Sequence, residues 1–481
     1  MIPLTGFAPD ADVTTPGLLT DCVNLIPYLN GMEGAPEPVT PASTPALAAA
    51  CIGAAVVSKL DDTRRIIAGT ATKLYELSAG AWADVSRAAV YNGGVDTRWS
   101  ITQFGDATLC ANRADVIQRS TGAAFADIST APKAEVLFTV GAFVMALNTN
   151  DGSEKPDGWH CCAAFDDTSW TPSLATQATS GRLVATSGRL TAGMRLGEYA
   201  IAYKQRSIYL GQYVGAPTVW NWIQVPGGDA GCIGKEAICD IGGAHFFVGD
   251  DNIWIFDGTR PIPVADGYVR QFFFDHSNPS YRYRTICVFD RQKNLVWVFY
   301  PSLGSITPDA ALVYHVVAKK WGVANRSIEA ALNYVSGGIT IDGLSAISST
   351  IDGLFSYSFD SQFWLAGGKS MSIFSTSHQL QSMTGVSTSS SMTTGDVGDD
   401  DAVSALNKIR LRYALAPTSA NVQTFIQQNS GVGFIAAATG SVLDGKFDMR
   451  QSARWHKATF SFTGAVKVTH MDAEITPAGM R

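Results

Sequence analysis

Short apolar runs alternate with polar turns along most of the chain. The clearest case joins Tyr199–Tyr203 to Ile208–Leu210 through a Lys-Gln-Arg turn. A second pair, Ala244–Val248 and Ile253–Phe256, follows with a Gly-Asp-Asp-Asn turn. Apolar or aromatic segments of this length, joined by tight polar turns, are typical of β-hairpins. Their occurrence in tandem indicates an internal repeat, which has to be defined before any catalytic motif is considered.

The repeat is an apolar pair, usually ending in an aromatic residue, that is followed about seven or eight residues later by Trp or Phe. Its second members stand at positions 75, 117, 163, 209, 254, 314 and 355, spaced by 41 to 46 residues except for one interval of 60. Four short strands in such a period predict a blade of a β-propeller, whose aromatic residues fill the space between neighbouring sheets. The predicted blade-core anchors are Tyr75, Trp82, Ile117, Phe125, Trp170, Tyr209, Trp220, Trp254, Tyr314, Trp321, Phe355 and Trp364.

The chain is therefore predicted to be an all-β protein, a β-propeller with an additional C-terminal β-domain. We expect an N-terminal extended arm at 1–50, the propeller at 51–365, a Ser/Thr/Asp-rich connection and loop at 366–406, and a β-sandwich-like domain at 407–481. Seven blades are expected, or six if the weak copy at Cys162-Ala163 belongs to an insertion. The long interval contains 267–281, where an aromatic cluster breaks the strand alternation and predicts a short helix or loop.

Composition agrees with this architecture and excludes several classes of protein. Of the 481 residues, 46% are hydrophobic and 16% are charged, with a formal net charge of −7. Lys and Arg are scattered, so no basic patch for wrapping nucleic acid is expected. No run reaches the roughly 18 apolar residues of a membrane span, and no membrane anchor is expected. Eight cysteines lack CxxC spacing and are expected to be buried, reduced thiols.

Several stretches of the sequence resemble enzyme motifs but do not match them. Around Gly228–Glu236, five residues separate Gly228 from Gly234, where a phosphate-binding loop needs four. Glu236 also stands where a magnesium-binding Ser or Thr is required, and this stretch is interpreted as a connection between blades. Neither GxSxG nor HExxH occurs. His245 and His315 lie in strand-like runs and are interpreted as core or edge histidines.

An acidic stretch contains Asp396, Asp399, Asp400 and Asp401. Such carboxylates could bind calcium, but they lack the ligand spacing of an EF-hand, so a solvated loop tip is favoured and ion binding is left open. Ser358–Trp364 lacks the Gly and the Trp spacing of the Asp-box found in propeller glycosidases. The sequence therefore predicts no catalytic residue, no cofactor and no metal site, and the protein is not expected to be an enzyme.

With the repeat defined, the order of features resembles the tail hub, or nozzle, protein of short-tailed bacteriophages, also called the packaged-DNA stabilisation protein. The matching stretches are Val23–Pro36, the hairpin Lys73–Val85, and most strongly IAYKQRSIYLGQYVGAPTVWNWIQVPGGDAGCIGKEA at Ile201–Ala237. HFFVGDDNIWIFDGTRPIPVA and VFDRQKNLVWVFYP…ALVYHVVAKKWGV continue the match. The resemblance covers most of residues 20–325.

The resemblance implies a structural virion protein of the tail, made and assembled in the cytoplasm of a bacterial host. It implies a homo-hexameric ring beneath the portal and adaptor. That ring would continue the DNA channel, help to retain packaged DNA without sequence-specific binding, and carry tail fibres or spikes and a plug or needle. The family offers no catalytic residue to transfer. Two alternatives stay open: a propeller module that binds or hydrolyses glycans, and a receptor-binding tail fibre subunit, which would commonly be a trimer.

Overall fold

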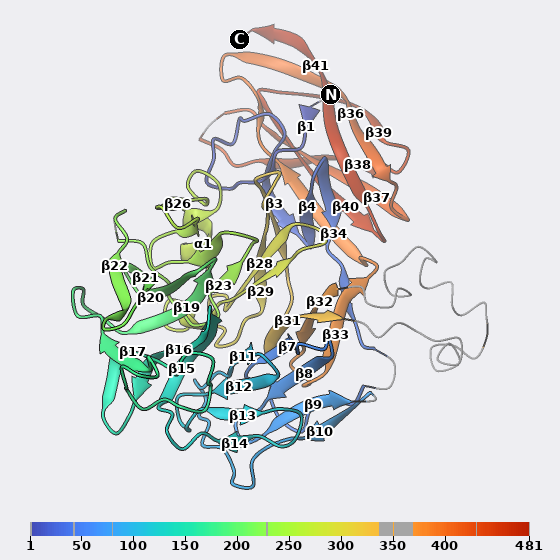
Figure 1. The fold of residues 1–481 in the computed structure, drawn as a ribbon. Coiled ribbons are helices and arrows are strands. Elements are labelled where there is room, and N and C mark those ends of the chain that lie inside the picture. The colour runs from blue at the N-terminus through green and yellow to red at the C-terminus, as the bar shows by residue number, and fades with distance from the viewer. Residues whose placement is uncertain are drawn as a thin grey trace.

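The structure is a computed structural model that describes residues 2–41, 44–78, 80–227, 229–335, 350, 369–429 and 431–480. Within these ranges the chain is built almost entirely of antiparallel strands (Figure 1). The exceptions are α1 (Arg270–His276) and the single-turn 3₁₀ helix η1 (Arg282–Arg284). The helix lies inside the predicted insertion at 267–281. No helix of these ranges is long and apolar enough to cross a membrane.

Five four-stranded sheets follow one another along the chain, and each has its strands in sequence order across the sheet. They are β7 (Ala54–Ser58), β8 (Arg64–Gly69), β9 (Leu74–Ser78) and β10 (Ala81–Asp84); β11 (Ser100–Phe104), β12 (Ala107–Ala111), β13 (Gln118–Ser120) and β14 (Ala126–Asp127); β15 (Lys133–Val140), β16 (Phe143–Asn150), β17 (Glu154–Cys161) and β18 (Thr179–Arg182); β19 (Leu190–Leu196), β20 (Tyr199–Lys204), β21 (Ile208–Gly215) and β22 (Val219–Gln224); and β23 (Ile238–Asp240), β24 (His245–Val248), β25 (Ile253–Phe256) and β26 (Pro261–Pro263).

Two further four-stranded units complete the ring, and both involve strands from the N-terminal region. The sixth unit is β27 (Ile286–Asp290), β28 (Leu295–Tyr300), β29 (Ala310–His315) and β30 (Lys320–Ala324), and its sheet continues through β4 (Leu25–Tyr28). The last unit is β31 (Ala330–Val335), β32 (Lys369–Phe374), β33 (Leu380–Gly385) and β6 (Glu37–Val39). Six blades are therefore free-standing sheets, and β27–β30 forms a blade that is joined to the C-terminal domain. The predicted fold class, a β-propeller with an additional C-terminal β-domain, is confirmed.

The C-terminal domain packs two largely antiparallel sheets face to face, and apolar residues of both lie in one continuous core. One sheet extends from β4 through β5 (Gly31–Gly34), β41 (Lys467–Met480) and β36 (Ala402–Leu415) to β39 (Lys446–Ala453), with β1 (Ile2–Pro3) beside β41. The other has β2 (Gly6–Phe7), β3 (Leu18–Val23), β34 (Ser389–Thr394), β40 (Trp455–Thr463), β37 (Ser419–Gln427) and β38 (Ile435–Ser441), with β35 (Val397–Gly398) beside β40.

Two of the predicted domain limits differ from the structure. Region 1–50 is not a free arm, because its strands pair with β30, β33, β34 and β41 (Figure 1). Region 366–406 is not a connection, because β32 and β33 complete the last blade and β34 enters the C-terminal domain. The physical reason is the same in both regions: hydrogen bonds to distant strands order segments whose own composition reads as a loop. The predicted propeller limit at 365 lies outside the described residues.

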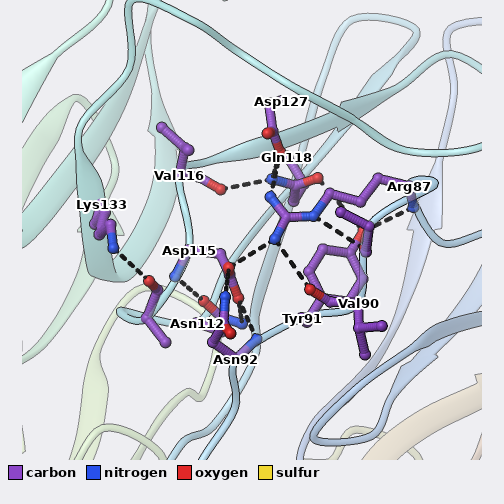
Figure 2. A network of polar contacts seen from close by, with 12 residues as sticks. Arg87, Val90, Tyr91, Asn92, Asn112, Asp115, Val116, Gln118, Asp127 and Lys133 are labelled. Atoms are coloured by element: carbon purple, nitrogen blue, oxygen red, sulfur yellow. Dashed lines mark hydrogen bonds and ion pairs between the residues drawn. The ribbon is translucent and has the colours of Figure 1, made fainter.

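A buried polar network joins the first two blades (Figure 2). Asp115, which follows β12, accepts hydrogen bonds from Arg87 at 2.7 Å, from the backbone and side-chain amides of Asn92 at 2.9 and 2.8 Å, and from Asn112 at 2.9 Å. Arg87 also binds Asp127 of β14 at 2.6 Å. One guanidinium thus ties the segment before β11 to two parts of the second blade, since its planar donors can serve both carboxylates.

Candidate functional site

A cavity lies at one end of the propeller axis, where the chain enters the innermost strands of several blades. It has a volume of about 780 Å³. Most of its lining comes from connections that lead into β7, β11, β23, β27 and β31. The rest comes from the β12–β13 and β28–β29 connections, from β15, β16, β17 and β27, and from the start of β19. Propellers converge on their axis, so residues from blades far apart in sequence meet here. This axial cavity is the candidate functional site.

The stretch that resembled a phosphate loop builds one wall of the axial cavity. It connects β22 to β23, as the sequence predicted, and it passes very close to other backbone. A Cβ at Gly231 would lie 2.2 Å from the carbonyl oxygen of Lys204, and one at Gly234 would lie 2.0 Å from that of Tyr283. Only glycine permits such approaches. The tight path turns the next two side chains, Lys235 and Glu236, toward the cavity.

Polar bonds cross the axis and close it. Arg98, before β11, forms an ion pair with Glu236, before β23, at 2.5 Å. The Lys235 ammonium donates a hydrogen bond to the carbonyl oxygen of Arg98 at 2.5 Å, and Arg98 donates to the carbonyl oxygen of Glu329, before β31, at 2.8 Å. These segments belong to the second, fifth and last blades. The bonds therefore span the ring, and the propeller axis is not an open passage.

Further bonds fix the rim of the cavity. Asp96 accepts hydrogen bonds from the hydroxyl of Tyr283 at 2.7 Å and from Arg284 at 2.6 Å. The carboxylate of Glu329 accepts from the backbone N–H of Cys51 at 2.9 Å and pairs with His378 at 2.7 Å. The pKa of Asp96 is lowered, first by the hydrogen bond from Tyr283 and then by Arg284. These contacts hold the entry segments of several blades in one fixed arrangement.

Opposite this rim, Asn148 of β16 bridges an arginine and a carboxylate. Its side-chain oxygen accepts from Arg113, and its amide donates to Glu135 of β15. Glu135 also faces Lys235, together with Glu236, and both carboxylates favour the charged ammonium. Burial outweighs them and lowers the pKa of Lys235 to about 8, because removing an ammonium from water disfavours its charged form. Lys235 is surrounded by protein atoms, yet part of its surface still faces the cavity.

The chemistry of the cavity favours binding over catalysis. All four carboxylates that line it already accept hydrogen bonds from protein donors: Asp96, Glu135, Glu236 and Glu329. A glycosidase needs two carboxyl groups across a sugar, one to give a proton and one to act as nucleophile or base. Carboxylates held in structural ion pairs and amide bonds are poorly suited to those tasks. The basic side chains Lys235 and Arg189 are the groups best placed to receive a ligand.

The predicted blade-core anchors lie in the packing between blades. Seven are buried (Ile117, Phe125, Trp170, Tyr209, Trp220, Tyr314 and Trp321), and Tyr75, Trp82 and Trp254 are half-buried. Phe355 and Trp364 lie outside the described residues. The rings touch as expected for blade packing: Tyr314 and Trp321 have centroids 4.7 Å apart, and Trp82 reaches Phe374 of the last blade at 5.7 Å. None of these anchors lines the axial cavity.

Asp396 and Asp400 of the acidic loop form polar contacts with other residues of the protein, and the candidate histidines and cysteines are buried. Asp396 pairs with Lys457 at 3.0 Å, and Asp400 accepts a hydrogen bond from the indole of Trp455 at 2.7 Å. Among the described residues, no group of three or more His, Cys, Asp or Glu could hold a metal ion. His245 and His315 are buried, as are all eight cysteines, which are free thiols.

Sequence reasoning missed the cavity residues, although the sequence does contain a signal for them. A charged residue stands directly before the apolar start of several innermost strands, as in Arg189 before β19 and Glu329 before β31. Arg98, Glu236 and Arg284 stand two residues before their strands. Aligning the repeats on their first strand would have shown this ring of charges. Aligning them on the aromatic anchors, which lie in later strands, conceals it.

The fold and its axial cavity define a class: a β-propeller carrying an interwoven C-terminal β-domain. No protein family model and no curated protein matches the sequence. Among solved structures, the chain is similar to PorZ, an essential bacterial surface component of the type-IX secretion system of Porphyromonas gingivalis, with 10% identity, a TM-score of 0.36, and 60% of this chain and 35% of that chain covered. The chain thus spans about a third of the length of PorZ.

Two other solved structures are similar over most of their own length. The computationally designed Ika8 protein has 8% identity and a TM-score of 0.37, covering 71% of this chain and 98% of that chain. YCF48 bound to a D1 peptide has 13% identity and a TM-score of 0.34, covering 62% of this chain and 86% of that chain. Likenesses at these values transfer no function.

Proposed function

We propose that this chain is a structural virion protein, a subunit of a ring-shaped, homo-hexameric tail nozzle of a short-tailed bacteriophage. In this role it continues the portal-adaptor DNA channel, helps to retain packaged DNA, and attaches fibres or spikes and a plug. The observation that carries the proposal is the sequence resemblance over most of residues 20–325, which is densest at Ile201–Ala237. That segment runs from β20 through β22 into the connection that lines the axial cavity.

The closed axis limits where a DNA channel could lie. Arg98, Glu236 and Lys235 bridge the axis of the propeller, so DNA does not pass through a single copy. Double-stranded DNA would instead pass through the centre of a ring of copies, each presenting its outer surface to the lumen. A net charge of −7 suits a passage that must not retain the strand by counterion release.

The coupling between the two domains also supports a load-bearing subunit. Strand β6 completes the last blade, while β4 joins β30 of the propeller to β5 and β41 of the C-terminal domain. At this junction Glu33 pairs with Lys293 of the β27–β28 turn at 3.1 Å and with Lys467 of β41 at 2.8 Å. Continuous sheet and the two ion pairs of the buried Glu33 carboxylate resist relative motion of the domains. A ring subunit under pressure from packaged DNA requires that stiffness.

The test is the oligomeric state of the full chain, measured by electron microscopy of the purified protein and of virions. We expect sixfold rings, located between the portal and the distal tail in virions. A stable monomer that does not join tails would contradict the proposal. A trimer at the tip of an appendage would favour the fibre alternative, and binding or cleavage of glycans by the monomer would favour a glycan module. The bonded carboxylates of the axial cavity argue against the hydrolase.

A further inference from the structure

We propose that the axial cavity is a binding site for a small oxyanion, a molecule carrying a carboxylate or phosphate group, and that Lys235 and Arg189 hold its charge. The inference concerns one subunit and goes beyond the proposed nozzle, since it holds whether or not copies form a ring. It rests on the position of Lys235 in the cavity and on the pairing of the charges that surround it.

The geometry directs the Lys235 ammonium at the cavity. Its neighbour Gly234 lies so close to the backbone of Tyr283 that a Cβ would not fit, which places Lys235 beside the cavity. One N–H bond is used on the carbonyl oxygen of Arg98. An ammonium carries three donors, so within the described residues two remain for a ligand. An ammonium surrounded by protein and facing a polar cavity gains most from an acceptor that is itself charged.

Within the described ranges, the hydrogen-bonding groups that remain free around the cavity are basic donors, and these favour an anion over a cation. Nine charged side chains line it, and two pairs cancel directly, Arg98 with Glu236 and Arg284 with Asp96. Arg113 is paired with Glu154 outside the cavity, and Glu329 is bound by Cys51 and His378. Among the described residues this leaves the charges of Lys235 and Arg189 opposite those of Glu135 and Glu329, and both carboxylates already accept hydrogen bonds from an amide or a backbone N–H. Neither basic group has an ion-pair partner in the part of the chain that the structure describes.

The groups around Lys235 explain why the site discriminates by charge. Glu135 faces it from β15, Glu236 lies beside it, Arg98 comes from the connection into β11, and the Cys110 thiol lies in β12. Burial raises the pKa of Cys110, so this thiol is neutral and adds no charge. Arg98 neutralises Glu236, which removes the repulsion that this carboxylate would exert on a bound anion. A bound oxyanion would give the Lys235 ammonium a hydrogen-bond acceptor of opposite charge.

Size and access fit a small molecule. A volume of about 780 Å³ falls in the range of roughly 300–1,000 Å³ typical of small-molecule sites. Arg189 and Asp96 at the mouth are exposed to solvent, so a ligand can enter from the end of the propeller. The cross-axis bonds of Arg98 form the floor. A polymer such as DNA could not pass this floor.

The experiment is isothermal titration calorimetry of the full chain with two probes, inorganic phosphate and succinate, against sodium chloride at equal ionic strength. We expect one saturable site for at least one probe, with a dissociation constant of about 1 mM or lower. Phosphate alone, succinate alone, or both would each support the site and would tell which oxyanion it prefers. No saturable binding of either probe overturns the proposal.

Variants and proton uptake connect the binding to Lys235. We expect Lys235→Met to weaken binding roughly tenfold or more and Arg189→Gln roughly fivefold, since each removes a charge-assisted hydrogen bond. Lys446→Met, an exposed lysine in the C-terminal domain, is the matched control and should bind like the unchanged protein. Equal binding by both cavity variants would overturn the assignment. Arg189 is exposed, so its variant keeps the test valid if Lys235→Met fails to fold.

A second readout separates Lys235 from a general effect of charge. Near pH 8 about half of the Lys235 side chains are neutral, so anion binding should take up a fraction of a proton per site. Titrations in two buffers of different ionisation enthalpy measure this uptake. We expect it near pH 8 in the unchanged protein, little at pH 6, and none in Lys235→Met. Binding without uptake near pH 8 would show that Lys235 does not hold the ligand.

Discussion

The network around Asp115 allows a sharp test of how the blades are held together. We consider Asp115→Asn, which keeps the shape of the side chain and removes its charge. Each carboxylate oxygen now receives two donors: Arg87 and the Asn92 side chain on one, and the Asn92 backbone and Asn112 on the other. An asparagine offers one oxygen, so its amide must face two donors whichever way it turns.

The expected loss can be worked from these contacts. Two hydrogen bonds disappear, at roughly 1 kcal/mol each, and Arg87 keeps only the more exposed Asp127 as a carboxylate partner. Breaking one partner of a buried ion pair costs about 3–5 kcal/mol, and we take this range as the expected loss because it already includes the two lost hydrogen bonds. Burial alone would raise the pKa of Asp115, but hydrogen bonds from Asn112 and Asn92 and the charge of Arg87 lower it. The charged form is therefore the one that stabilises the junction.

Hydrogen exchange followed by mass spectrometry measures this junction directly, because it reports local opening in a large protein that need not unfold in one step. A loss of about 3–5 kcal/mol corresponds to exchange faster by roughly 100- to 4,000-fold in the peptides that contain Asn92 and Asp115. The matched control is Asp84→Asn, which removes an exposed pair with Lys73 and should cost about 1 kcal/mol or less. Equal effects of the two variants, or less than a threefold change in Asp115→Asn, would refute the reasoning.

Two further predictions concern pH and close packing. His245 is buried and neutral, with Tyr203 donating to its Nδ1 at 2.7 Å and its Nε2 donating to the carbonyl oxygen of Arg195 at 2.9 Å, and burial lowers its pKa from 6.5. The stability that neutral His245 contributes should be fully present above pH 6.5 and should fall on acidification, by up to about 1.4 kcal/mol per pH unit. Urea unfolding at pH 7.5 and 5.5 should show a smaller loss of stability in His245→Gln than in the unchanged protein. An equal loss in both proteins would be contrary evidence. Gly234→Ala places a Cβ 2.0 Å from a carbonyl oxygen and should lower the free energy of unfolding by roughly 2–3 kcal/mol. In the control Gly433→Ala the new Cβ has no atom within 4 Å, so the thermal unfolding temperature should be nearly unchanged. Equal unfolding temperatures of the two variants would disprove the required close approach.

The architecture of the propeller could be predicted because its cause is local. Aromatic residues such as Tyr314 and Trp321 recur at the spacing of one blade, since each sheet must cover its neighbour. A short helix or loop in the long interval could be predicted for a similar reason, a local break in the strand alternation, and α1 lies there.

The closing of the ring and the axial cavity could not be predicted because their causes are distant. Strand β6 is only Glu37–Val39, and its partner β33 lies more than three hundred residues away. Periodicity within a segment says nothing about which edge it will join. Likewise, the bond from Lys235 to Arg98 joins residues 137 positions apart. In the sequence, Lys235 and Arg98 are ordinary charged residues before a strand. Only the closed ring places them next to each other.

The interweaving of the first strands has a consequence for how the protein is made. Strands β1, β3 and β6 find their partners in β41, β34 and β33, all of which leave the ribosome late. At roughly 5–20 residues per second, the early segment waits on the order of half a minute or more with its hydrogen bonds unmade. An incomplete chain can close neither the last blade nor the C-terminal domain. Folding of both domains is therefore completed only after synthesis is nearly finished. Only then does the chain present the surfaces on which assembly depends.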